Sequence, residues 1–156
     1  MFKLFQKTKP FFEGWEKKRE TISPFIPEAG TVGNLKLGDR IESIQSLGKP
    51  VSFNQEEEDY YTLEYEDFIF ESKSGFVTYI GCRLGKVQVS TEEGKSLDKG
   101  MGINQVMDEL GAPDQDDVGD LDDVILTYTK NGIVIECEFG KRQELVRINC
   151  FSKEET

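Results

Sequence analysis

Histidine is absent from the 156-residue sequence. It is the commonest general base of enzymes and the usual protein ligand of transition metals. The sequence also lacks a G-x-S-x-G motif, a Walker loop and a dinucleotide-binding fingerprint. A carboxylate pair could still perform acid/base chemistry, but no spacing selects one pair from the 30 acidic residues. These absences predict a protein that is not an enzyme and that needs no metal or cofactor.

Cysteine is scarce, and long hydrophobic runs are missing. Cys82, Cys137 and Cys150 are odd in number and show no C-x-x-C spacing, which argues against a disulfide framework or a zinc site. We expect three buried thiols in a reducing cytoplasm. No secretory signal is recognisable, and no apolar run approaches the length of a membrane span. The sequence therefore predicts a cytoplasmic protein without stable membrane insertion.

Basic residues are outnumbered by acidic ones. Lys and Arg total 19 against 30 Asp and Glu, which gives a net charge of −11 and an isoelectric point near 4.6. Such a surface repels phosphate, so nucleic acid is not expected as a ligand, whereas a basic protein partner suits it. The 37% of hydrophobic residues suffice for a core in a chain of this length. We expect a monomer or a weak dimer.

What is present is a short helix pattern that occurs twice. In residues 100–113 the apolar side chains of Ile103, Val106, Met107 and Leu110 share one helical face, and Gly111 ends the helix. Residues 38–50 repeat this pattern of spaced apolar residues followed by a terminating glycine, in one residue fewer. Their apolar positions are Ile41, Ile44 and Leu47. Asp39 and Glu42 there form a pattern typical of a capping box.

The segments after each helix pattern also correspond. Each helix is followed by an acidic loop and three predicted strands, at 60–65, 68–71 and 76–84 and then at 124–129, 133–139 and 145–151. A further short strand is predicted at 87–89. This order predicts an arm and connector at 1–34, a first repeat at 35–89, a linker at 90–96 and a second repeat at 97–156. The expected fold class is α+β, with a helical segment packed on one face of an antiparallel sheet in each of two tandem repeats.

The helix pattern resembles a known family. Gly100, Met101, Val106, Leu110, Gly111 and Pro113 match the repeat of beta-lactamase-inhibitory-protein-like (BLIP-like) domains, which the small outer-membrane-assembly lipoproteins also use. The first copy keeps Gly38, Ile44, Leu47, Gly48 and Pro50. The resemblance implies helices on one side of the sheet and a free opposite face that binds another protein. The chain departs from the lipoproteins in lacking their export signal and lipid-bearing cysteine.

Strand alternation identifies the residues of that free face. If Ile135 and Cys137 face the helices, Glu136 and Glu138 face away, and on the last strand Arg147 and Asn149 point outward. The first unit contributes tyrosines and carboxylates to the same face. The candidate partner-binding residues on the sheet are Tyr60, Glu64, Glu71, Tyr79, Glu136, Glu138 and Arg147. The alternative is an ordinary solvated sheet face with cross-strand pairs.

Two acidic loops, at 55–59 and 114–123, complete the predicted binding surface. Glu57, Asp59, Asp116 and Asp120 are the candidate residues there. The second loop shares carboxylate spacing with a calcium loop, but Val118 and an isoleucine occupy required ligand positions, so no metal is expected. Both loops could present carboxylates to one basic partner, or they could simply be solvated.

The segments at 1–20 and at 23–33, which precede the first repeat, are interpreted separately. Residues 1–20 place five aromatic side chains among basic ones, which suits either docking to an anionic surface or an arm packed on the domain. Residues 23–33 hold two prolines and two glycines and are predicted to be a connector.

Together these patterns predict a binding protein. The leading hypothesis is an immunity or inhibitor protein that blocks a toxin or enzyme with its free sheet face and acidic loops. The alternative is an intracellular sensory or scaffold domain that binds a small ligand in a deep apolar pocket between the repeats. A carboxylate-dependent enzyme would instead require a buried Asp or Glu pair in a cleft.

Overall fold

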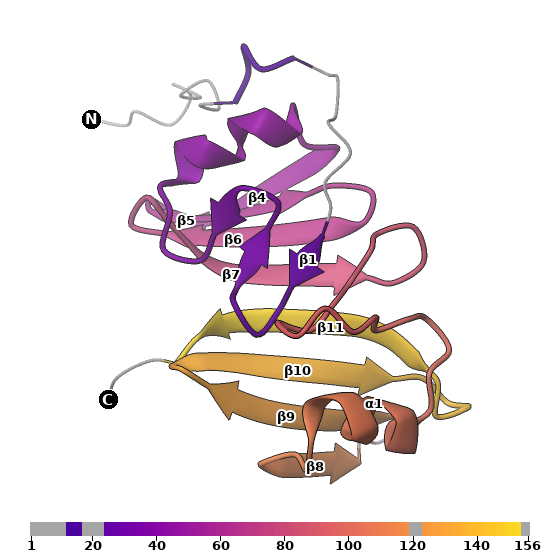
Figure 1. Ribbon diagram of the computed structural model, residues 1–156. Helices are drawn as coiled ribbons and strands as arrows, with labels where there is room; N and C mark the ends of the chain where they lie inside the picture. Colours follow the sequence, from indigo (N-terminus) through magenta and orange to yellow (C-terminus); the bar gives the residue numbers. More distant parts are fainter. Residues whose placement is uncertain (1–11, 17–23, 119–122, 154–156) are drawn as a thin grey trace.

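The fold is built from one large antiparallel sheet and a thinner layer on one of its faces. The computed structural model describes residues 12–16, 24–118 and 123–153. Of these residues, 48% lie in strands and 12% in helices. Figure 1 shows the large sheet running through the whole molecule, with the helices and a small sheet in front of it.

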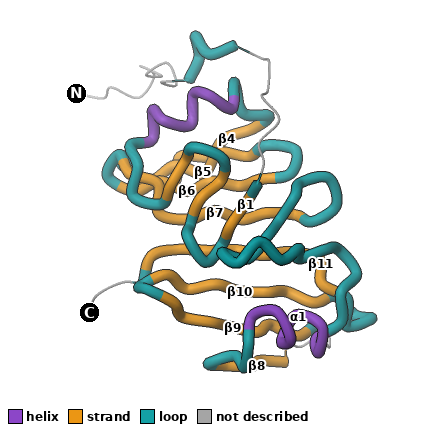
Figure 2. The backbone as a smooth tube through the Cα atoms, in the orientation of Figure 1, coloured by secondary structure: helices purple, strands orange, loops and turns teal. Residues whose placement is uncertain are grey.

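The large sheet has eight strands in the described part of the chain, in the order β4-β5-β6-β7-β11-β10-β9-β8. The first four strands, here called the first meander, are β4 (Ser52–Glu57), β5 (Tyr60–Glu64), β6 (Phe68–Lys73) and β7 (Phe76–Arg83). The others, the second meander, are β8 (Gln115–Val118), β9 (Val124–Lys130), β10 (Ile133–Phe139) and β11 (Leu145–Ser152). β7 and β11 pair antiparallel, with Ile148 opposite Cys82 and Cys150 opposite Ile80. This seam joins the meanders into one continuous sheet (Figure 2).

The covering layer consists of two short helices and a three-stranded sheet. The helices are the 3-10 helix η1 (Ile41–Leu47) and the α-helix α1 (Ile103–Leu110). The small sheet contains β1 (Phe25–Ile26), β2 (Thr31–Val32) and β3 (Leu35–Lys36). Its β1–β2 turn packs closely, because a Cβ atom on Gly30 would lie 2.8 Å from Leu37 Cδ1 and 3.2 Å from Ile133 Cδ1. Gly30 also has a φ of +66°, so glycine is favoured there on both counts.

The core lies between this layer and the large sheet. Alternate residues of each central strand point into it, and each helix contributes its apolar side. The three apolar residues of η1 are buried, as are Val106 and Leu110 of α1. The sequence-based positions for the inward helix residues in the first unit are therefore confirmed.

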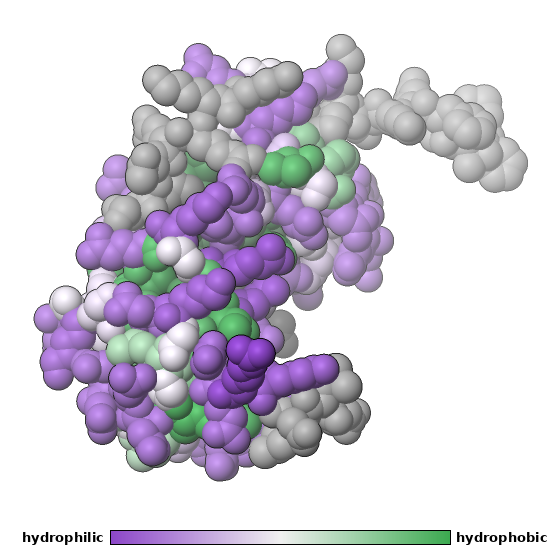
Figure 3. Space-filling model, turned by 90° about the vertical axis from the view of Figure 1, so that its right-hand side faces the viewer, coloured by the Kyte–Doolittle hydropathy of each residue, from purple (hydrophilic) through white to green (hydrophobic). Residues whose placement is uncertain are grey.

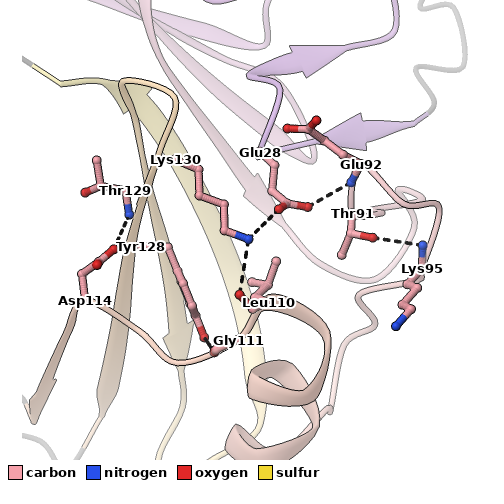
Figure 4. Close-up of polar contacts among 10 residues, drawn as sticks. All are labelled: Glu28, Thr91, Glu92, Lys95, Leu110, Gly111, Asp114, Tyr128, Thr129 and Lys130. Carbon is pink, nitrogen blue, oxygen red and sulfur yellow. Dashed lines mark hydrogen bonds and ion pairs between the residues drawn. The ribbon is translucent and has the colours of Figure 1, made fainter.

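A polar cluster ties the small sheet to the second meander (Figure 4). Glu28, in the β1–β2 turn, is buried, and its Oε2 accepts a hydrogen bond of 2.7 Å from Lys130 Nζ at the end of β9. Its other oxygen accepts the backbone N–H of Glu92 at 2.9 Å. Lys130 Nζ also donates to the carbonyl of Leu110 at 3.3 Å, where α1 ends. One ammonium group thus links the small sheet, the α-helix and the large sheet.

The predicted fold class is wrong. The protein is mostly β, with one eight-stranded and one three-stranded sheet, and it is not a pair of α+β units with a helix packed on each sheet. The physical reason is the β7–β11 pairing, which merges strands from both halves of the chain into a single sheet. Each half also supplies only one short helix to the described structure, too little to form a full helical layer.

Several local predictions also need correction. The two predicted acidic loops partly form strands, because residues 55–57 belong to β4 and residues 115–118 to β8, while residues 119–122 lie outside the described part of the chain. The connector at 23–33 contains β1 and β2, while residues 87–89 form only an isolated bridge from Val89 to Phe25. Asp39 does not cap η1: Arg40 is the cap residue, and Asp39 Oδ2 accepts the backbone N–H of Lys36.

The aromatic and basic region at the start of the chain is only partly described. Of the aromatic and basic segment 1–20, the structure describes residues 12–16, in which Phe12 is buried and its ring contacts Phe53 edge to face at 4.8 Å. No helix in the described ranges is long and apolar enough to cross a membrane.

Candidate functional site

The face of the large sheet opposite the covering layer, here called the outer face, carries the predicted sheet residues. Strand pairing arranges them in rows across the sheet. One row runs Thr62, Glu71, Tyr79, Phe151, Val134 and Thr129. The next runs Glu64, Ile69, Gly81, Asn149, Glu136 and Thr127, and a third contains Arg83, Arg147, Glu138, Ile125 and Asp117. The seven sheet residues chosen from the sequence therefore share one face, and both described helices lie on the other side (Figure 1).

An aromatic pair marks the seam of this face. Tyr79 of β7 lies directly opposite Phe151 of β11, and the two rings stack with centroids 6.1 Å apart and an interplanar angle of 17°. Both side chains are partly exposed. Burial raises the pKa of Tyr79 to about 12, opposed by Arg147 and supported by Glu138, Glu136 and Glu71. Tyr79 therefore stays protonated at neutral pH, in the middle of a group of carboxylates.

Beside the aromatic pair, three polar side chains converge above Gly81. Arg147 Nε donates to Asn149 Oδ1 at 2.8 Å, and Asn149 Nδ2 donates to Glu138 Oε2 at 2.6 Å. The Arg147 Nε atom lies 3.6 Å from the same Glu138 oxygen. A Cβ atom on Gly81 would meet Arg147 Nη2 at 2.8 Å and Asn149 Oδ1 at 2.9 Å. Glycine at this point of the strand leaves the space in which the polar cluster forms.

Glu136 lies next to this cluster and forms no ion pair with a described Lys or Arg. It lies opposite Asn149 on the outer face. Burial raises the pKa of its carboxyl group, and the charge of Glu138 supports this effect, whereas a hydrogen bond from Asn149 and the charge of Arg147 oppose it. A half-buried carboxylate with this environment would be stabilised by an incoming positive charge.

Tyr60 and Glu71 form a second polar contact on the same face. The Tyr60 hydroxyl donates to Glu71 Oε1, and this bond is the largest cause that raises the pKa of Tyr60 to about 12. The contact positions the Glu71 carboxylate on the strand next to Tyr79.

An open groove lies along the aromatic pair. Its volume is about 500 Å³, within the usual range for ligand sites. Its floor is mainly apolar and includes Tyr79, Phe151 and Val134, while polar side chains stand at its ends. The residues around it are Tyr60, Glu71, Lys73, Thr78, Tyr79, Val134, Phe151, Ser152 and Lys153. The groove spans the seam between the meanders, but it is open and not the deep pocket expected for a small-ligand domain.

The predicted acidic-loop residues lie at the two edges of the sheet. Glu57 is in edge strand β4 opposite Tyr60, and Asp59 is in the following turn. Asp116 is in edge strand β8 opposite Leu126, so it shares the side of the covering layer, whereas its neighbour Asp117 belongs to the outer face. Asp120 lies outside the described residues. The carboxylates thus border the outer face instead of meeting in one loop cluster.

Three parts of this site were not predicted from the sequence: Phe151, Gly81 and the central role of Asn149. Phe151 follows Arg147 and Asn149 by alternation, so the sequence contained the signal for its outward position. A glycine inside a predicted strand was also a signal for close side-chain approach. The stacking of Tyr79 on Phe151 was not predictable, because it depends on the β7–β11 register.

The cysteines take no part in the outer face. All three are buried, as predicted, and burial raises the pKa of each thiol to about 12. They are protonated at neutral pH and therefore poor nucleophiles. Within the described ranges, no group of three or more Cys, Asp and Glu side chains is arranged to hold a metal ion.

The surface seen from the right-hand side of Figure 1 is mainly hydrophilic, with hydrophobic residues in small separate areas (Figure 3). Comparison with protein-family models, curated proteins and solved structures gave no significant match to this chain. The geometry of the outer face is therefore the feature from which a function is inferred.

Proposed function

We propose that this protein is a non-enzymatic binding module that holds a basic partner protein against its outer face. The observation that carries the proposal is the partly exposed aromatic pair of Tyr79 and Phe151, with carboxylates on the strands to either side. Aromatic side chains supply large contact areas at a small entropy cost, and such residues dominate the binding energy of many interfaces.

The charge of the molecule supports the choice of a basic partner. The net charge is −11, and carboxylates border the outer face along edge strands β4 and β8. Opposite charges on the two proteins would accelerate association and orient the partner. A toxin or enzyme that is neutralised in the cytoplasm is the proposed partner class, because an inhibitor needs a preorganised face and no catalytic groups.

The proposal is tested by immobilising the protein and identifying the partner proteins that it retains. We would compare wild type, Glu136→Lys on the outer face, and Glu42→Lys, which makes the same charge change on an exposed residue of η1. A specific partner should be retained by wild type and by Glu42→Lys, lost from Glu136→Lys, and released as the salt concentration rises. Circular dichroism of each variant would establish that it is folded.

Two outcomes contradict the proposal. One is the absence of any retained protein at low and at moderate salt. The other is equal retention by the Glu136→Lys and Glu42→Lys variants, since a partner held in this way would not depend on the outer face.

The groove along the aromatic pair favours a second candidate function, the binding of a small ligand by a sensory or scaffold domain. Its apolar floor and polar ends have the composition of ligand sites. A rise in the melting temperature with a single compound from a metabolite collection, lost in Phe151→Ser, would support this candidate over protein binding.

A further inference from the structure

The groove beside the aromatic pair has different charges at its two ends. Lys73 and Lys153 stand at one end, near the β6–β7 turn and the end of β11. Glu71 lines the groove, and Glu136 lies in the neighbouring row, two residues along β10 from Val134. A ligand in the groove therefore meets positive charge in one direction and negative charge in the other.

The floor between these ends is apolar and aromatic. Tyr79 and Phe151 stack side by side, and Val134 lies directly opposite Phe151 on the next strand. Lys and Arg side chains have an apolar stem and a charged end, so they fit surfaces of this kind along their whole length. A guanidinium or ammonium group is also attracted to the face of an aromatic ring.

We propose that the groove receives one Arg or Lys side chain of the partner, with its stem on Tyr79 and Phe151 and its charged end at the Glu136 carboxylate. This inference depends on the proposed function and specifies the group that the outer face recognises. Lys73 and Lys153 set the direction of the side chain, because they would repel a cation at their end of the groove.

Glu136 suits this role better than the other carboxylates of the face. Glu138 already accepts a hydrogen bond from Asn149 and lies 3.6 Å from Arg147 Nε, and Glu71 accepts the Tyr60 hydroxyl. Glu136 also receives a hydrogen bond from Asn149 and is affected by the charge of Arg147, but it forms no ion pair with a described Lys or Arg. Burial raises the pKa of its carboxyl group despite these two neighbours. A cation from outside would compensate the half-buried charge, and an Arg could do so with two parallel hydrogen bonds.

Titration of the full chain with two peptides tests the inference. The probes are acetyl-Gly-Arg-Gly-amide and the same peptide with citrulline, a neutral side chain of nearly the same shape. We expect the arginine peptide to shift the backbone amide resonances of Tyr79, Glu136 and Phe151 in ¹⁵N-labelled protein, and the citrulline peptide to leave them unchanged. The comparison isolates the positive charge from the shape of the side chain.

Two variants assign the contacts. Glu136→Gln should lower the affinity for the arginine peptide about fivefold or more, which is the usual scale for one hydrogen bond to a charged group at a partly exposed site. Phe151→Leu keeps an apolar floor but removes one aromatic ring, and it should lower the affinity for the arginine peptide about threefold. Glu42→Gln on η1 loses the same charge far from the groove and should bind the peptide as wild type does.

Several outcomes overturn the inference. They are equal shifts with both peptides, shifts confined to the acidic edges at 52–59 and 114–118, and an affinity unaffected by Glu136→Gln. Shifts of the groove amides that grow with protein concentration alone would assign the groove to a second copy of this chain and would also overturn it.

The experiment separates this inference from the proposed function. If a partner is lost from Glu136→Lys but the arginine peptide does not shift Glu136, the side-chain assignment is wrong and the proposed function stands. If the peptide binds with the expected charge dependence but no protein is retained, the side-chain site is supported and the proposed function fails.

Discussion

The two meanders have the same strand order but are covered in different ways. In each, a tyrosine hydroxyl donates to a glycine carbonyl directly after the helix: Tyr65 to Gly48 at 2.7 Å and Tyr128 to Gly111 at 2.9 Å. The helices themselves differ, because η1 is a 3-10 helix and α1 is an α-helix. The difference shows how the spacing of apolar residues selects the helix type.

In η1 the apolar residues are spaced by three, at Ile41, Ile44 and Leu47, and all are buried. A 3-10 helix has three residues per turn, so this spacing aligns them on one side. In α1 the apolar residues Ile103, Val106, Met107 and Leu110 follow the 3.6-residue period of an α-helix. The first helix pattern, at 38–50, is one residue shorter than the second, at 100–113, and it forms a 3-10 helix instead of an α-helix. Both helices nevertheless bury their apolar side.

The largest expected effect concerns the seam that joins the meanders. Ile148→Ala removes a fully buried side chain of β11 opposite Cys82 and should cost about 3 kcal/mol of unfolding free energy. Because the sheet is continuous, both meanders should unfold in one transition, which denaturant titration followed by tryptophan fluorescence and far-UV circular dichroism would detect.

Val146→Ala is the control for this prediction, since it truncates a neighbouring residue of β11 that is 37% exposed. It should change the stability by less than about 1 kcal/mol. Two separate transitions in wild type or in Ile148→Ala would show that the meanders are independent units.

The next effect distinguishes the meanders through their lysines. Lys130→Met removes the ammonium group that links Glu28 to the end of α1 and leaves a carboxylate that is only 11% exposed without its cation. The expected loss is about 2 kcal/mol. Lys86→Met, in the loop after β7, removes a 2.5 Å contact to Glu66 between side chains that are 72% and 58% exposed, and it should cause no measurable loss of stability.

Chemical denaturation of both lysine variants and of the double variant Glu28→Gln/Lys130→Met measures this difference. The double variant should recover part of the loss, because the unpaired carboxylate is gone. Similar losses of unfolding free energy for Lys130→Met and Lys86→Met would mean that the buried ion pair of Lys130 stabilises the protein no more than the exposed one of Lys86.

A smaller effect separates the two tyrosine contacts. Gly48 is buried, so Tyr65→Phe leaves a carbonyl without water and should cost about 2 kcal/mol. Gly111 is exposed, so its carbonyl can bind water in Tyr128→Phe, and the loss should be about 1 kcal/mol. Urea unfolding at 25 °C gives both values, and an equal or reversed order would contradict this account.

The smallest expected effect has the opposite sign and concerns the outer face. Because burial raises the pKa of Glu136 in the folded protein, its contribution to stability is full below the unfolded pKa and is lost as the pH rises through the folded pKa. Glu138 opposes ionisation further, whereas Asn149 and Arg147 favour it. Glu136→Gln should therefore be more stable than wild type at pH 7.

The stability difference between Glu136→Gln and wild type should shrink at acidic pH, where the wild-type carboxyl group is neutral in both states. Melting temperatures across that pH range test the sign, with Glu42→Gln as the control. If Glu136→Gln is less stable than wild type at pH 7, the ionised Glu136 side chain stabilises the fold, contrary to this prediction.

Local patterns predicted much of the sheet from the sequence. Alternation correctly separated inward from outward residues on the central strands, as for Cys137 and Glu138, because a strand has a fixed two-residue period. Val146 departs from this alternation, because it lies at a bulge in the β10–β11 pairing and is exposed where a regular strand would turn it inward.

The remaining errors have physical causes of three kinds. The edge strands β4 and β8 are rich in acidic residues with low strand propensity, so they resembled loops. The β7–β11 seam, and with it the stacked Tyr79 and Phe151, depends on pairing between segments almost 70 residues apart, which no local pattern encodes. The small sheet was missed because its strands have only two residues each.

The acidic side chains of β4 and β8 have a consequence for solutions of the protein. A strand at the border of a sheet presents unpaired backbone groups to which another copy could add its own strand. Carboxylates such as Glu56, Glu57, Asp116 and Asp117 stand along both borders, so approaching copies repel each other at neutral pH. Acidification would neutralise these groups and remove the barrier, so the protein should be handled well above its isoelectric point near 4.6 to prevent sheets from joining into larger assemblies.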